Sequence, residues 1–232
     1  MPFGEHNSWD FFPRHLYQRE IMDPYVAMDH FFQCKNLVDF RKAIDDFFHS
    51  ACAGTCTLEQ EPVDALFLYE LLEKMLELAY ILTGQKDNEL LYERRPLKQP
   101  VAEMDVIDRL GLLKFHYEKR YVHIGSWDYF PRQLTPEELM DPYLVFKSLF
   151  ELHALPEWRD ELKMCLESAI SRQSVYESMG DESNVYMTSI LVKKLVEAFF
   201  VLYTARPAKE EEYAQYKLQE EKQIAAEISE EG

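Results

Sequence analysis

The chain has 232 residues, of which 47% are hydrophobic and 29% charged, a composition typical of a globular protein with enough apolar material for a sizeable core. Its formal net charge is −17. A surface of that charge repels phosphate backbones and anionic lipid, and no basic patch offsets the repulsion, so we expect neither nucleic acid nor a membrane as a partner. With only 7 glycines the chain has few residues for tight turns, which disfavours a strand-and-turn architecture.

Two further features of the sequence indicate the cellular compartment in which the protein is expected. The first residues lack the basic and apolar regions of a signal peptide, and the longest purely apolar run, at 198–203, is far too short to span a bilayer. The cysteines show no paired zinc spacing: Cys34, Cys52, Cys56 and Cys165. We therefore expect reduced thiols and a cytoplasmic location.

The sequence repeats itself after 118 residues. Of the 18 positions in 8–25, 12 are identical to those in 126–143, where about one would be expected by chance. The motifs that the two segments share are Ser-Trp-Asp-aromatic-Phe-Pro-Arg and Met-Asp-Pro-Tyr. These matches predict an internal duplication.

In chain order, each half begins with the polar-aromatic segment and then starts a helix with an Asp-Pro pair. Aspartate is a good N-cap, and proline at the first helical position loses no hydrogen bond. The pairs at 23–24 and 141–142 predict helices at about 23–34 and 141–153. Just before the second pair, Thr135 and Glu138 have the spacing of a capping box, whereas the first half keeps Glu20 but lacks the hydroxyl cap.

Apolar residues spaced by three and four predict two further helices in each half. Their expected ranges are 38–52 and 62–83 in the first half, and 156–171 and 183–204 in the second. The last helix of each half is the longest and most apolar, so we expect it at the centre of its unit. We align these two helices at an offset of 119, which matches Tyr80 with Phe199.

The rest of the chain is a connection and a tail. A helix from about Val101 to Lys119 is expected between the halves, and the residues after Pro207 are rich in Glu, Gln, Lys and Ala. The expected organisation is a helical repeat unit at 1–84, a loop and linker helix at 85–124, a second unit at 125–205 and an acidic, partly frayed helical tail at 206–232. The sequence thus predicts an all-α fold in which a duplicated three-helix unit packs as a compact helical bundle.

The repeated segment is the only motif specific enough to suggest a site. Its candidate ligand-binding residues are Trp9, Asp10, Arg14, Trp127, Asp128 and Arg132. In one interpretation the two arginines offer guanidinium forks to an anionic ligand, with aromatic rings for stacking. In the interpretation that we favour the segment is structural: both tryptophans are core residues, and each aspartate pairs with its arginine or caps a turn.

No constellation of catalytic or metal-binding residues stands out. Asp45, Asp46 and His49 share a helical face, but the second half does not reproduce them. A thiol at a helix C-terminus, as expected near Cys52 and Cys56, has a raised rather than a lowered pKa and is a poor nucleophile. Glycine-rich phosphate loops are absent from the sequence. We expect no catalytic residues, no metal and no cofactor.

The leading functional interpretation is a non-enzymatic interaction or scaffold module that binds a protein partner through a groove between the units or through the acidic tail. The alternative is a helical-bundle hydrolase or anionic-ligand-binding protein with its site at the seam between the repeats. The sequence leaves open the partner, the oligomeric state and the way in which the two units pack.

Overall fold

The computed structural model describes residues 6–53, 62–83, 126–171, 174–175 and 182–204. Every regular element in these ranges is a helix, so the all-α prediction is confirmed for them. None of these helices is both long enough and apolar enough to cross a membrane. The predicted linker helix and acidic tail lie outside the described residues.

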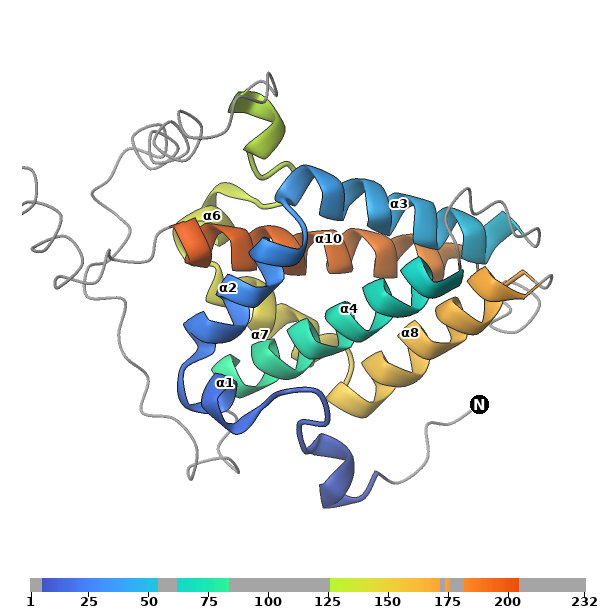
Figure 1. Cartoon of the computed structure of the whole chain (residues 1–232), viewed down its shortest axis with the longest axis horizontal. Coiled ribbons are helices and arrows are strands. Elements are labelled where there is room, and N and C mark those ends of the chain that lie inside the picture. Colours follow the sequence, from blue (N-terminus) through green and yellow to red (C-terminus); the bar gives the residue numbers. More distant parts are fainter. Residues whose placement is uncertain (1–5, 54–61, 84–125, 172–173, 176–181, 205–232) are drawn as a thin grey trace, which may run out of the picture.

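The helices follow the same order in the two halves (Figure 1). The first half contains η1 (Ser8–Phe11), α1 (Gln18–Met22), α2 (Pro24–Cys34), α3 (Leu37–Ala53) and α4 (Pro62–Thr83). The second contains η4 (Ser126–Tyr129), α6 (Pro136–Met140), α7 (Tyr143–Leu152), α8 (Leu155–Ile170) and α10 (Glu182–Thr204). The three predicted helices of each half are confirmed, with ends within two residues of the expected positions.

Both Asp-Pro pairs lie at helix starts, and each aspartate accepts the expected hydrogen bond. Helix α2 begins at Pro24 as predicted, whereas α7 begins at Tyr143, one residue after Pro142. The Asp23 carboxylate accepts a hydrogen bond from the amide of Tyr25 at 3.1 Å. The Asp141 carboxylate accepts one from the amide of Tyr143 at 3.2 Å. Each bond satisfies an amide that has no partner within its own helix.

The predicted capping box is present in the second half. The Thr135 hydroxyl accepts from the Glu138 amide at 3.2 Å, and the Glu138 carboxylate accepts from the Thr135 amide at 2.8 Å. In the first half Tyr17 replaces the threonine, and Glu20 still accepts from the Tyr17 amide at 2.8 Å. The short helix α1 therefore forms with half of the box.

The long helices pack across the halves. Helix α4 packs mainly on α8, α10 packs mainly on α3, and α3 and α8 pack on each other; Figure 1 shows the first two pairs side by side. Helices α2 and α7 lie against both α4 and α10. The two halves are thus interlocked, and their helices share a single cluster of buried apolar side chains.

Aromatic contacts show how the long helices correspond. The Tyr80 ring lies 6.0 Å from Phe11 of its own half and 5.3 Å from Phe150 of the other. In the same way Phe200 lies 6.3 Å from Tyr129 and 5.4 Å from Phe32. Tyr80 therefore matches Phe200, which makes the offset of these helices 120. The predicted offset of 119 is wrong by one residue, because side-chain contacts rather than residue similarity define equivalent positions.

Candidate functional site

The repeated segment forms two similar turns on the surface. We call residues 8–14 turn 1 and residues 126–132 turn 2. Each begins with a short 3-10 helix, η1 or η4, and the two lie on opposite sides of the bundle (Figure 1).

Turn 1 is held by an arginine from the other half of the chain. The Arg159 guanidinium, on α8, donates hydrogen bonds to the backbone carbonyls of Asp10 and Phe12, the latter at 2.9 Å. It also donates to the Glu77 carboxylate on α4 at 2.5 Å. The side chains of Arg159 and Glu77 are 4% and 0% exposed. A buried ion pair therefore fixes the backbone of turn 1.

The same glutamate holds the end of turn 1. The backbone amides of Arg14 and His15 donate to the two oxygens of Glu77 at 2.7 and 2.8 Å. The carboxylate thus joins the turn, α4 and α8 in one hydrogen-bonded unit.

Turn 2 has an equivalent arginine on α3. The Arg41 guanidinium donates to the carbonyls of Asp128 and Phe130, each at 2.5 Å, and to Glu197 on α10 at 2.8 and 2.5 Å. Glu197 in turn accepts from the amide of Gln133 at 2.7 Å. We call the two groupings clamp 1 (Arg159 and Glu77) and clamp 2 (Arg41 and Glu197).

The two clamps were not predicted, although the sequence contains a signal for them. Arg41 and Arg159 are 118 residues apart, and Glu77 and Glu197 are 120 apart. Both glutamates lie in the most apolar helix of their half, where an unpaired carboxylate would be costly. A charged residue retained at matching positions in such helices indicates a buried partner.

The predicted pairing of aspartate with arginine inside each turn is confirmed. Arg14 lies 3.4 Å from Asp10, and Arg132 lies 3.1 Å from Asp128. All four side chains are at least one-third exposed, so these are surface ion pairs that contribute little to stability. The structure does not bring Arg14 and Arg132 together, because the turns lie on opposite sides of the bundle.

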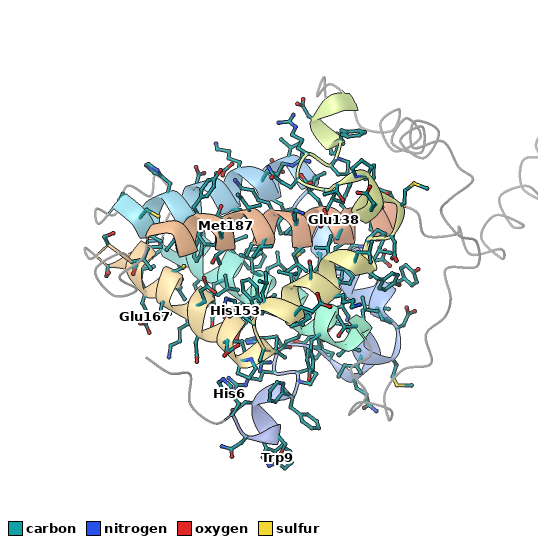
Figure 2. The ribbon with its side chains drawn as sticks, turned by 180° about the vertical axis from the view of Figure 1, so that it is seen from behind. His6, Trp9, Glu138, His153, Glu167 and Met187 are labelled. Atoms are coloured by element: carbon teal, nitrogen blue, oxygen red, sulfur yellow. The ribbon has the colours of Figure 1, made fainter. Side chains whose placement is uncertain are left out.

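Trp9 is on the surface. Its side chain is 74% exposed and packs on Phe12, itself 55% exposed, with 5.5 Å between the ring centroids. Figure 2 shows Trp9 at the edge of the molecule, beyond the helices. The prediction that Trp9 is a core residue is wrong, because clamp 1 holds the turn by its backbone and leaves the ring outside the bundle. Trp158, by contrast, is buried in the core. The side chain of Trp127 lies outside the described residues.

A second polar contact is buried between α8 and α10. The Glu161 carboxyl hydrogen-bonds the Thr188 hydroxyl, and burial raises the pKa of Glu161. One turn further along α8, burial and then the nearby Glu161 raise the pKa of Cys165 to about 12. Cys165 is therefore a neutral thiol at physiological pH, unsuited to nucleophilic attack.

One of the side chains considered for a metal site is engaged in another contact. Asp45 forms an ion pair with Lys193 on α10. Within the described part of the chain, no group of three or more His, Cys, Asp or Glu side chains is arranged to hold a metal ion.

Comparison with known proteins adds no functional information. No family model, no curated protein and no solved structure matches the chain.

Proposed function

We propose that this protein is a non-enzymatic interaction or scaffold module that presents two copies of a rigid turn to protein partners. The observation that carries the proposal is the exposure of Trp9 on a turn whose backbone is fixed by a buried ion pair. Exposed aromatic residues on rigid supports are the usual anchors of protein interfaces.

The clamp supports a binding role because it does not use the tryptophan side chain. Within turn 1, Arg159 binds the backbone carbonyls of Asp10 and Phe12, which any residue at these positions would supply. Folding therefore gives no reason for a tryptophan at position 9, yet tryptophan recurs at position 127. A ring that the bundle leaves exposed, on a backbone that the bundle immobilises, loses little entropy on binding.

The placement of the turns favours a scaffold. Because turn 1 and turn 2 project from opposite sides of the bundle, one molecule has room for a partner at each turn. An internal duplication that retains both turns would make the module bivalent, and linked sites bind more strongly together than singly.

The net charge of the chain restricts the kind of partner that would bind. The chain carries a net charge of −17, so a partner whose aromatic-binding pocket is bordered by Lys and Arg is favoured in encounter and binding. The acidic tail would add to this attraction. The cysteines within the described residues are free thiols, which supports placing the protein in the cytoplasm.

The anionic-ligand alternative lacks the geometry that it needs. Its two arginines would have to offer free guanidinium groups at a common seam, whereas each pairs with the aspartate of its own turn. We therefore give priority to protein partners.

The test is a pull-down from a lysate of the source organism with the full chain, followed by direct measurement of Kd for the purified partner. Trp9→Ala is expected to weaken binding by about tenfold or more, the effect of removing an interface anchor. Tyr186→Ala, which removes a ring that is 68% exposed on α10, is the matched control and should bind as the wild type does.

Stability is measured on the same samples. The free energy of unfolding of Trp9→Ala should lie within about 0.5 kcal/mol of the wild type, because the ring is not in the core. Wild-type affinity in both Trp9→Ala and Trp127→Ala would contradict the proposal.

A further inference from the structure

His15, the residue after turn 1, lies next to a second buried carboxylate. Its Nε2 atom is 2.9 Å from Oε2 of Glu73, whose side chain is 5% exposed, whereas the imidazole is 35% exposed. The Glu73 carboxylate also accepts a hydrogen bond from the Tyr69 hydroxyl, and burial together with this carboxylate raises the pKa of Tyr69. The second half has no such group, since Gln133 takes the place of His15 and Lys193 that of Glu73.

The two clamps therefore differ in charge balance. Clamp 2 has one carboxylate, Glu197, for one guanidinium, Arg41. Around clamp 1, the carboxylates of Glu73 and Glu77 share the single guanidinium of Arg159. A buried carboxylate needs a cation or a proton of its own. Lys74 cannot supply the charge, because it pairs with Glu20 at 2.7 Å, which leaves the His15 imidazole as the group that becomes the cation for Glu73 when it is protonated.

The Glu73 carboxylate also lies close to a second cation. Its Oε1 atom lies 3.5 Å from Nε of Arg159, and that buried nitrogen has no hydrogen-bond partner. In clamp 2 the corresponding nitrogen of Arg41 donates to Glu197 at 2.8 Å. A small side-chain movement would let Glu73 leave His15 and complete the hydrogen bonding of Arg159.

We propose that His15 and Glu73 form a pH-dependent latch on turn 1. As an imidazolium, His15 holds Glu73 and keeps the turn closely docked; as a neutral imidazole it brings no charge, and Glu73 moves towards Arg159. Histidine is the side chain that changes charge between pH 5 and 8. Turn 1 is therefore docked more firmly at pH 6 than at pH 8, while turn 2 does not respond.

Several other titratable groups lie around the latch. They are Glu77 and Tyr69 from α4, Arg159 from α8, Asp10 and Arg14 within turn 1, and His6, whose ring lies 6.3 Å from that of Phe11. A His15→Gln variant leaves all of these groups in place, so it isolates the contribution of His15. An effect of the latch on partner binding rests on the proposed function, whereas the latch itself does not.

The experiment is amide hydrogen exchange on the full chain at pH 6 and pH 8, corrected for the intrinsic pH dependence of exchange. Residues 7–15 are compared with residues 126–133 in the same molecule. In the wild type, protection of turn 1 should fall about two- to fivefold from pH 6 to pH 8, the range expected for a partly exposed ion pair. Protection of turn 2 should not change.

His15→Gln, which copies the residue at the matching position of the second half, should abolish the pH dependence of turn 1. Glu73→Gln should do the same by removing the other partner, and it serves if the first variant does not fold. Equal responses of the two turns in the wild type, or an unchanged response in both variants, would overturn the latch. Because exchange needs no partner, this result is independent of the binding test on Trp9.

Discussion

Turn 1 and turn 2 are docked by the same backbone contacts but lie in different electrostatic surroundings. Each is held by an arginine from the other half that binds two carbonyls and a buried glutamate. Beside clamp 1 the chain adds Glu73, His15 and Tyr69; beside clamp 2 the corresponding residues are Lys193, Gln133 and Ser189. The comparison separates the contacts that dock the turn, which both halves share, from the groups that are present beside turn 1 alone.

A second difference lies deeper in the bundle. Glu161 and Thr188 form a buried hydrogen bond between α8 and α10. The matching residues of the first half, Ala43 and Leu68, are apolar and buried. The same packing position thus tolerates either an apolar pair or a satisfied polar pair, because only an unpaired polar group is strongly penalised there.

The largest expected effect comes from removing a clamp arginine. Arg41→Ala should lower the free energy of unfolding by about 3–5 kcal/mol, because it leaves the buried Glu197 without its cation. Arg159→Ala should cost more than Arg41→Ala, since Arg159 lies close to two buried carboxylates, Glu77 and Glu73, whereas Arg41 pairs with Glu197. Urea unfolding of the two variants gives the comparison.

Lys163→Ala is the control for these arginine variants. Lys163 is 63% exposed and pairs loosely with Glu167, so its loss should change stability by less than about 1 kcal/mol. Equal costs for the two arginine variants would show that Glu73 does not depend on Arg159.

A smaller loss of stability is expected when the buried Glu161–Thr188 hydrogen bond of the second half is broken. Thr188→Val should cost about 1–3 kcal/mol at pH 7, because it leaves the buried Glu161 carboxyl without a partner. The hydroxyl bond stabilises the charged carboxylate, and burial raises the pKa of Glu161. A raised pKa means that the stability contributed by the protonated carboxyl is present at low pH and is lost as the pH rises through the folded-state pKa.

The cost of Thr188→Val should therefore be smaller near pH 4.5 than at pH 7, which thermal unfolding at the two pH values would measure. Glu161→Gln combined with Thr188→Val should remove this pH dependence. A cost that does not vary with pH in Thr188→Val would show that Glu161 is not the titrating partner.

The smallest effects should be the same in both halves. Asp23→Ala and Asp141→Ala should each lower stability by about 1 kcal/mol, the usual cost of losing an N-cap. Chemical denaturation of the two variants, with the exposed Glu151→Ala as a near-neutral control, tests this equality. A difference above about 1 kcal/mol would mean that one aspartate has a role beyond its cap.

Local signals accounted for what was predicted correctly. The Asp-Pro pairs, the capping box at Thr135 and the spacing of apolar residues place the three longer helices of each half within two residues, because these features act between neighbours in the chain. The pairing of Asp10 with Arg14 is equally local, since one helical turn separates the two residues.

The sequence by itself thus determined the helices, their caps and the repetition of the turns. Only the tertiary structure decided that the halves interlock, that the long helices match at an offset of 120, and that Trp9 is exposed while Trp158 is buried. These features depend on pairs that are distant in the chain: Arg159 and Glu77 are 82 residues apart, and Arg41 and Glu197 are 156 apart. Such contacts form only when helices from both halves meet, so neither local periodicity nor residue type could have predicted which surface of each turn would remain exposed.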